Sequence, residues 1–202
     1  MSLTATTQRR ELSALLHKIG VLRFGAFTLK DGRQSPFYLD MRILVSHPAA
    51  LARVARAMLQ RAETLRYDRL AGLPYAGLPI AVAMSLIAER PLIYARKETK
   101  EYGTKRLIEG EFQPGEVALM IDDVVTSGGA KLEAAAPYRA AGLVVEDVLV
   151  IVDRSDAAGA AALAAAGLRL HSVLAVRDLF DDLRALGTVP AADLERALAF
   201  LG

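Results

Sequence analysis

Residues 119–129 read Leu-Met-Ile-Asp-Asp-Val-Val-Thr-Ser-Gly-Gly, and this stretch decides the fold class. The apolar run 117–121 shows no alternation with polar residues, which is typical of a strand buried on both faces of a parallel sheet. Two carboxylates and a Thr-Ser-Gly-Gly turn follow the run, and a helix is predicted over 129–141. A buried strand that leads through a turn into a helix is the start of a β-α-β unit.

The same alternation continues on both sides of this stretch. Short apolar runs predict strands at 69–72, 91–95 and 148–152, and the segments between and after them predict helices at 78–89 and 157–166. Strands that alternate with helices in this way indicate a parallel sheet covered on both faces. We therefore predict an α/β fold with a central, mostly parallel sheet flanked by helices, whose ligand site lies where strands end and helices begin.

The two ends of the chain add smaller elements. The predicted elements are helices at 7–18 and 48–62, a hairpin at 24–33 that turns at Asp31-Gly32, an extended segment at 35–40, a strand at 168–176, and helices at 177–186 and 191–201. A length of 202 residues suits one ordinary globular domain, so we predict a single domain over 1–202.

Composition narrows the class of protein. The formal net charge is only +2, and the cations gather in one loop rather than along a helix, which argues against a nucleic-acid partner. The chain has no cysteine, which excludes disulfides and fits a reducing compartment. It shows no signal peptide and no apolar run of the roughly 18 residues that a membrane helix needs. We expect a soluble, cytoplasmic protein without a membrane partner.

The turn after the acid pair has the chemistry of a phosphosugar site. Small residues at 126–130 can offer several backbone N–H groups to one phosphate, and the start of the following helix adds partial positive charge. Asp122 and Asp123 can accept hydrogen bonds from ribose hydroxyls or help to hold hydrated Mg²⁺. An acid at a strand end and a glycine in the next turn also occur without such a function. Here, however, the apolar run, the acid pair, the turn and the helix all follow in order.

A second cluster of polar residues lies in the segment 96–114, which we predict to be a long mobile loop. It carries five cations within eleven positions, Arg96, Lys97, Lys100, Lys105 and Arg106. A solvated loop of mixed charge is the ordinary interpretation of such a run. The buried strand before it and its glycines favour a hinged lid whose cations close on a departing diphosphate.

The acid pair with its turn resembles the motif of the type I phosphoribosyltransferases, which bind phosphoribosyl pyrophosphate (PRPP). The lid sequence Arg-Lys-Glu-Thr-Lys at 96–100 is similar to the catalytic loop of orotate phosphoribosyltransferase, and the run through Gly110 is similar to that domain of the UMP synthases. Matches also occur at 24–36, 74–79, 152–154 and 170–173, so the resemblance spans nearly the whole chain. It implies an N-terminal hood of about residues 1–45, completed by C-terminal segments, and a core of about 48–160.

The resemblance also implies the roles of individual residues. Catalysis falls to Lys100, Lys97, Arg96, Asp122 and Asp123. The PRPP site is lined by Lys30, Tyr75, Ala76, Arg96, Lys97, Lys100, Tyr102, Asp122, Asp123, Val124, Val125, Thr126, Ser127, Gly128, Gly129 and Ala130. Orotate is faced by Tyr38, Leu39, Thr126 and Arg154, and the Arg154 guanidinium suits the orotate carboxylate. Mg²⁺ is held mainly through PRPP and water, and the enzyme is a homodimer whose lid acts across the interface.

Two departures from many bacterial members of the family are visible. Tyr102 stands where those members have His, and Ala76 stands where they have Lys, so Lys97 and Lys100 must carry more of the diphosphate charge. The predicted function is transfer of the phosphoribosyl group from PRPP to orotate, in the synthesis of pyrimidine nucleotides. The alternatives are a purine phosphoribosyltransferase and a non-catalytic regulator that senses PRPP or nucleotides. The cations of the lid argue against the regulator, since a sensor need not stabilise a departing diphosphate.

Overall fold

The computed structural model describes residues 3–29, 32–96 and 107–202. Its contacts divide the chain into two compact units, one formed by Met1–Ala50 with Leu174–Gly202 and the other by Leu51–Val173. No helix within the described ranges is both long and apolar enough to cross a membrane.

The larger unit is built on a six-stranded sheet in the order β5-β4-β3-β6-β7-β8. Its strands are β3 (Arg69–Gly72), β4 (Leu92–Ala95), β5 (Ile108–Glu109), β6 (Val117–Val125), β7 (Val144–Asp153) and β8 (Arg169–Ala175). Strand β3 pairs in parallel with β4 and with β6, and β6 pairs in parallel with β7, whereas β4 and β5 are antiparallel. The sheet is therefore mostly parallel, as predicted.

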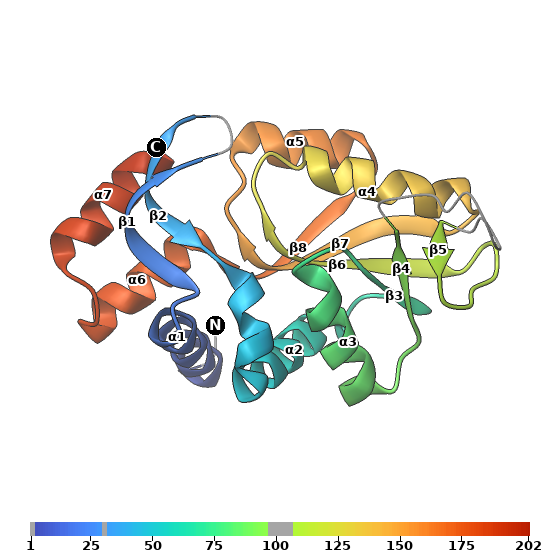
Figure 1. The fold of residues 1–202 in the computed structure, drawn as a ribbon, viewed down its shortest axis with the longest axis horizontal. Coiled ribbons are helices and arrows are strands. Elements are labelled where there is room, and N and C mark those ends of the chain that lie inside the picture. Colours follow the sequence, from blue (N-terminus) through green and yellow to red (C-terminus); the bar gives the residue numbers. More distant parts are fainter. Residues whose placement is uncertain (1–2, 30–31, 97–106) are drawn as a thin grey trace. The chain divides into compact units, whose positions relative to one another are not determined.

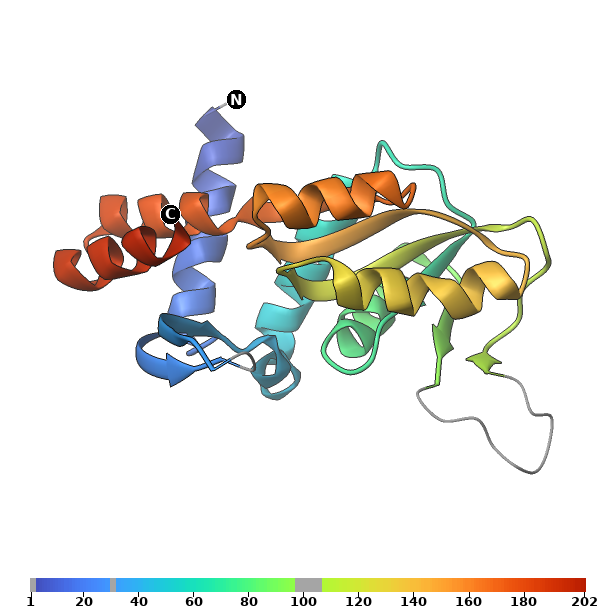
Figure 2. The same ribbon diagram turned by 90° about the horizontal axis from the view of Figure 1, so that it is seen from above.

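Helices cover both faces of this sheet. They are α2 (Pro48–Ala62), α3 (Gly77–Ala88), α4 (Gly129–Ala140) and α5 (Ala157–Ala165). Helices α4 and α5 lie on one face and α2 and α3 on the other (Figure 1), and Figure 2 shows α4 and α5 side by side over the strands. Most side chains of β6 and β7 beneath them are buried, which is why the central parts of these strands are continuous apolar runs.

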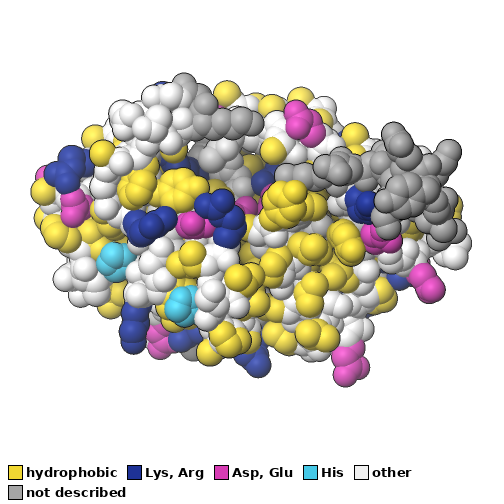
Figure 3. Space-filling model, in the orientation of Figure 1, with side chains coloured by type: hydrophobic (Ala, Val, Ile, Leu, Met, Phe, Trp, Pro, Cys, Tyr) yellow, Lys and Arg dark blue, Asp and Glu magenta, His cyan; other side chains and the backbone are white. Residues whose placement is uncertain are grey.

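Helix α3 has a clearly apolar outward face. It contains no charged residue, and Val82, Leu86 and Ile87 are 41%, 76% and 39% exposed. Apolar side chains gather over this helix on the surface drawn in Figure 3. A helix that is apolar all round is normally covered on all sides.

The smaller unit combines a hairpin with three helices. The hairpin pairs β1 (Leu22–Thr28) with β2 (Gln34–Leu39), and the helices are α1 (Leu3–Lys18), α6 (Val176–Leu186) and α7 (Ala191–Leu201). Its core contains the buried rings of Phe37 and Phe180, whose centroids lie 5.0 Å apart edge to face. Such aromatic pairs stabilise by about 1 kcal/mol beyond the area that they bury.

The structure corrects several predicted boundaries. Helix α1 begins at Leu3 rather than at Thr7, and a 3-10 helix at Met41–Ser46 was not predicted. Strand β6 continues to Val125 because Val124 and Val125 still pair with β7, so the acid pair lies inside the strand and not after it. Likewise β7 spans Val144–Asp153 rather than 148–152.

The prediction of a loop over 96–114 was wrong in part. Residues Ile108–Glu109 form β5, which pairs with Tyr94 and Ala95 of β4. A two-residue strand is too short to show any periodicity, so the sequence could not reveal it.

Candidate active site

The acid pair lies on a central strand of the sheet. Strand β6 is flanked by β3 and β7, and its Asp122 and Asp123 stand near the carboxyl end, the end at which ligands of parallel sheets bind. Asp122 is buried and Asp123 is half-buried. Both acids therefore lie at the end of the sheet where the sequence analysis predicts a phosphosugar site.

Asp122 is held from two sides. Its Oδ2 accepts a hydrogen bond from the Lys131 ammonium group of α4, and its Oδ1 accepts from the Asp123 backbone N–H at 2.8 Å. The Lys131 and Asp122 side chains are only 8% and 12% exposed, so this is a buried ion pair. The charge of Asp122 is thus neutralised by the protein itself.

Asp123 has a different environment. Its Oδ1 accepts the Val124 backbone N–H at 2.8 Å, and its nearest charged neighbour is Asp122. Burial, together with the like charge of Asp122, raises the pKa of Asp123 to about 6, although Lys131 opposes this rise. Raised carboxyl pKa values of this kind are common where a ligand or metal later supplies the missing positive partner.

A tight approach of α3 fixes the backbone at the acid pair. A Cβ atom at Gly77 would lie 2.5 Å from the Ile121 carbonyl oxygen and 2.8 Å from Asp122 Cα, so only glycine fits there. The loop before α3 is bound to the same strand, because Leu73 donates its N–H to the Ile121 carbonyl at 2.9 Å. This loop carries the predicted PRPP residues Tyr75, which is 72% exposed, and Ala76, which is half-buried.

Close contacts with α5 fix the backbone of the turn after β6. Gly128 has φ of +80°, and a Cβ there would lie 2.9 Å from Leu163 of α5. A Cβ at Gly159 of α5 would lie 2.8 Å from the Thr126 carbonyl, so α5 packs directly against the turn. Because α4 starts at Gly129, the turn ends at a helix N-terminus, where free N–H groups favour anions.

Most residues of this turn are exposed to solvent. They are Thr126, Ser127, Gly129 and Ala130, whereas Gly128 is buried. The preceding residues Val124 and Val125 lie in β6. The structure therefore brings the predicted phosphate-binding residues together at one strand end.

Arg154 lies beside the same end of the sheet. Its backbone N–H donates to the Val125 carbonyl at 3.0 Å, which places it directly after β7 and next to β6. Asp153 stabilises the following bend, since its Oδ1 accepts both the backbone N–H and the hydroxyl of Ser155. Arg154 itself is half-buried.

Arg96 comes directly after β4. Its backbone N–H donates to the Leu107 carbonyl at 2.8 Å, and its guanidinium lies 3.5 Å from the Glu109 carboxylate. The predicted PRPP residues Lys30, Lys97, Lys100 and Tyr102 lie outside the described residues. Tyr38 and Leu39 are half-buried residues of β2 in the smaller unit.

Two residues of α4 were missed by the sequence analysis, Lys131 and Tyr138. They lie on one buried stripe of the helix, and their spacing of seven residues, with Ala135 between them, is the signal that could have revealed them. No group of three or more His, Cys, Asp or Glu residues within the described ranges could hold a metal ion without a ligand's help. The carboxylates of Asp122 and Asp123 are nonetheless oxygen donors of the kind that Mg²⁺ prefers.

A parallel sheet with an acid pair on its central strand and a small-residue turn at the next helix defines the class of type I phosphoribosyltransferases. No protein-family model matches the chain. It is 40% identical to orotate phosphoribosyltransferase of Cenarchaeum symbiosum over 88% of this chain and 90% of that protein. The chain therefore belongs to the orotate phosphoribosyltransferase family.

Solved structures agree with this assignment. UMP synthase of Leishmania donovani superposes with a TM-score of 0.88 at 40% identity, over 96% of this chain. The chain spans 42% of the length of that protein. Orotate phosphoribosyltransferase of Mycobacterium tuberculosis in complex with PRPP superposes with a TM-score of 0.69 at 32% identity, over 85% of this chain and 98% of that one.

Proposed function

We propose that this chain transfers the 5-phosphoribosyl group of PRPP to orotate, which yields orotidine 5′-monophosphate and diphosphate in the synthesis of pyrimidine nucleotides. The observation that carries the proposal is the acid pair of β6 followed directly by a turn of small residues at the N-terminus of α4, in a chain of the orotate phosphoribosyltransferase family. The M. tuberculosis relative was solved with PRPP bound, which supports PRPP as the donor.

In this proposal the two ends of PRPP meet different parts of the chain. The turn at 126–130 takes the 5-phosphate through backbone N–H groups at the start of α4. Asp123 accepts hydrogen bonds from the ribose hydroxyls, while Asp122 behind it forms an ion pair with Lys131. Arg96 takes the diphosphate together with Lys97 and Lys100.

The acceptor end is occupied by orotate. Its carboxylate pairs with the Arg154 guanidinium. Positive charge on the ribose grows as the bond to diphosphate breaks, and fixed cations stabilise the negative charge that develops on the leaving group. No covalent bond to the enzyme is needed. Mg²⁺, bound mainly through PRPP and water near the acid pair, would neutralise part of the diphosphate charge.

Homodimeric assembly and a cytoplasmic location belong to the same proposal. The uncharged outer face of α3, with Leu86 76% exposed, supports assembly because a face of this kind is normally covered by a partner. The absence of cysteine in the sequence fits a reducing compartment.

The direct test is an activity assay with the purified chain, Mg²⁺ and PRPP. Loss of orotate absorbance, with no turnover of adenine or hypoxanthine, is the expected result. Turnover of a purine in place of orotate would reassign the acceptor. Binding of PRPP with no turnover of any base would favour a regulator.

Lys100→Ala tests the role assigned to the lid. We expect turnover to fall by roughly 10²–10³-fold with PRPP affinity little changed, because the variant loses one cation that acts on the developing diphosphate charge. Steady-state kinetics with PRPP and orotate measure this effect. Turnover like that of the wild type would remove Lys100 from the mechanism.

A further inference from the structure

Helix α4 is bound to the sheet by polar contacts at both ends of one stripe. Lys131, Ala135 and Tyr138 follow each other at spacings of four and three residues, so they lie on one face of the helix, and all three are buried. Lys131 contacts Asp122 on β6, and the Tyr138 hydroxyl accepts a hydrogen bond from the Ala95 backbone N–H at 2.9 Å. The helix that begins at the phosphate-binding turn thus also contacts the last residue of β4.

The Ala95 N–H lies where the ladder of the sheet ends. The pairing of β4 with β3 stops at Ile93. The N–H of Arg96 points to β5, where it donates to the Leu107 carbonyl. Because successive N–H groups of a strand alternate in direction, the Ala95 N–H points to the side that β3 no longer reaches. The Tyr138 hydroxyl therefore accepts the hydrogen bond of the Ala95 N–H, for which β3 offers no carbonyl group.

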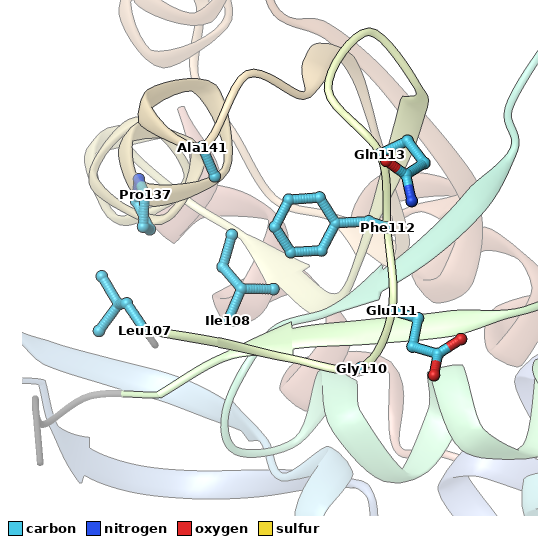
Figure 4. Close-up of a pocket in the computed structure, with 8 residues that line it drawn as sticks. All are labelled: Leu107, Ile108, Gly110, Glu111, Phe112, Gln113, Pro137 and Ala141. Atoms are coloured by element: carbon cyan, nitrogen blue, oxygen red, sulfur yellow. The ribbon is translucent and has the colours of Figure 1, made fainter. Parts of the chain in front are cut away.

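A cavity lies on the β5 side of this junction. It has a volume of about 590 Å³ and lies between β5 with the residues on either side of it and the last turns of α4. Figure 4 shows Leu107 and Ile108 on one side of it, Pro137 and Ala141 on the other, and the Phe112 ring pointing between them. The buried side chains of Ala95, Ile108 and Tyr138 belong to one core cluster, and the hydroxyl contact adds a directed hydrogen bond to that packing.

The hydroxyl is suited to a fixed structural contact. Tyr138 is fully buried, and burial raises the pKa of its phenol to about 12. The group therefore stays neutral and keeps the same hydrogen-bonding character throughout the physiological pH range.

We propose that Tyr138 is a positioning residue that fixes the end of β4, and with it Arg96, relative to the phosphate-binding turn at the start of the same helix. Arg96 follows Ala95 directly, so any shift of Ala95 moves the backbone of Arg96. The inference rests on the proposed function, in which the turn takes the 5-phosphate and Arg96 the diphosphate. In that arrangement α4 sets the distance between the two anionic ends of PRPP.

Tyr138→Phe is the test, because it keeps the ring and removes only the hydroxyl. We expect the dissociation constant of Mg²⁺-diphosphate, measured by calorimetry, to rise about tenfold, while that of ribose 5-phosphate stays within twofold of wild type. In turnover assays kcat should fall while the KM for orotate is unchanged. Exchange of the Ala95 amide hydrogen should also become faster in the variant, since that N–H loses its acceptor.

Ala136→Gly is the matched control. Ala136 is an exposed residue of the same helix, so the glycine lowers the midpoint of thermal unfolding but leaves the Tyr138 hydroxyl in place. We expect diphosphate affinity and kcat to stay at wild-type values. An equal loss in both variants would mean that general loosening of α4 explains the effect, and the positioning role would be overturned.

The two proposals fail in different ways. Diphosphate affinity and Ala95 exchange that are the same in Tyr138→Phe and wild type would overturn the positioning role, even if the wild type turns over orotate. A wild type that turns over no base would overturn the proposed function. The calorimetric and exchange measurements need no turnover, so they would still decide the role of Tyr138.

Discussion

Two buried carboxylates, Asp182 in the smaller unit and Asp122 in the larger, are held by cations in different ways. Asp182 is 1% exposed and accepts two hydrogen bonds from the Arg9 guanidinium and one from the Ser13 hydroxyl, at 2.9–3.1 Å. Asp122 accepts one from the Lys131 ammonium group and one from the Asp123 backbone N–H. Arginine provides a fixed two-point fork, whereas lysine is a compact point charge.

The difference shows how an ion pair that stabilises the fold is distinguished from an ion pair that belongs to the ligand site. The contacts of Asp182 join α1 to α6, and its neighbourhood carries the further cation Arg10. Arg9 also pairs with the exposed Asp178 at 3.0 Å. Asp122 stands beside the half-buried carboxylate of Asp123, whose pKa is raised because burial and a like charge act on it. Asp182 is paired with cations of the chain itself, whereas Asp123 can be satisfied by a ligand's hydroxyl groups or by a cation.

Lys131→Met should give the largest effect, because it leaves Asp122 buried beside Asp123 with no cation between them. Breaking a buried ion pair by removing one partner typically costs about 3–5 kcal/mol of stability. We expect a loss in that range at pH 8, measured by urea unfolding, together with weaker binding of PRPP. At pH 5 the loss should be smaller, since protonation can remove the repulsion between the two acids.

Lys131→Arg serves as the control for this change, since it keeps the charge. It should recover most of the stability at pH 8. A Lys131→Met protein as stable as wild type at pH 8 would show that the pair does not compensate Asp122, and the contrast with Asp182 would then disappear.

The sequence was sufficient for those features that depend on local chemistry. The continuous apolar run before Asp122 predicted the central strand, and the small residues at 126–130 predicted the turn, because both patterns are confined to a few consecutive positions. Helix α2 was predicted with both of its ends, since Pro48 marks the first turn of a helix. The class of fold followed from the order of these elements.

The rest depended on contacts between distant positions. Lys131 stands alone as a lysine in the first turn of a predicted helix, and only the packing of α4 on β6 makes it the partner of Asp122. Tyr138 and Ala95 are 43 residues apart, and no local pattern connects them. Strand β6 extends past the acids because β7 continues to pair with it, which is a property of the sheet and not of the residues at 122–125.

Arg9→Met tests the ion pair of Asp182, to which the comparison assigns a structural role. The variant leaves Asp182 buried with Ser13 and the more distant Arg10, whose Nε lies 3.7 Å from Oδ1. We expect a loss of about 3 kcal/mol of stability, at the lower end of the range for a broken buried pair, because Arg10 remains and Arg9 is itself 21% exposed.

Catalysis should be unchanged by this substitution. The kcat and KM values for PRPP and orotate, measured well below the unfolding midpoint, are expected to match wild type, in contrast to Lys131→Met. A kinetic defect in Arg9→Met as large as its loss of stability would show that the structural pair also serves the site.

The smallest effect is the dependence of stability on pH through Asp123. Burial and the charge of Asp122 raise its pKa in the folded protein to about 6 from an ordinary value of 3.8. The folded protein therefore binds this proton more tightly than the unfolded chain. Its contribution to stability is full below pH 4 and is lost as the pH rises through 6, with a total change of about 3 kcal/mol, of which about 2 kcal/mol falls between pH 4 and pH 7.

Asp123→Asn isolates this contribution, because asparagine has the same shape and does not titrate. Asp40 and Asp147 have lowered pKa values, since guanidinium groups donate hydrogen bonds to them, so they change stability in the opposite direction. Their effects are common to both proteins and cancel in the difference between variant and wild type. The variant should gain about 2 kcal/mol of stability relative to wild type between pH 4 and pH 7, as measured by urea unfolding across that range. A difference that does not change with pH would mean that Asp123 is already compensated within the chain, as Asp182 is, and that the larger unit holds no buried acid awaiting a ligand.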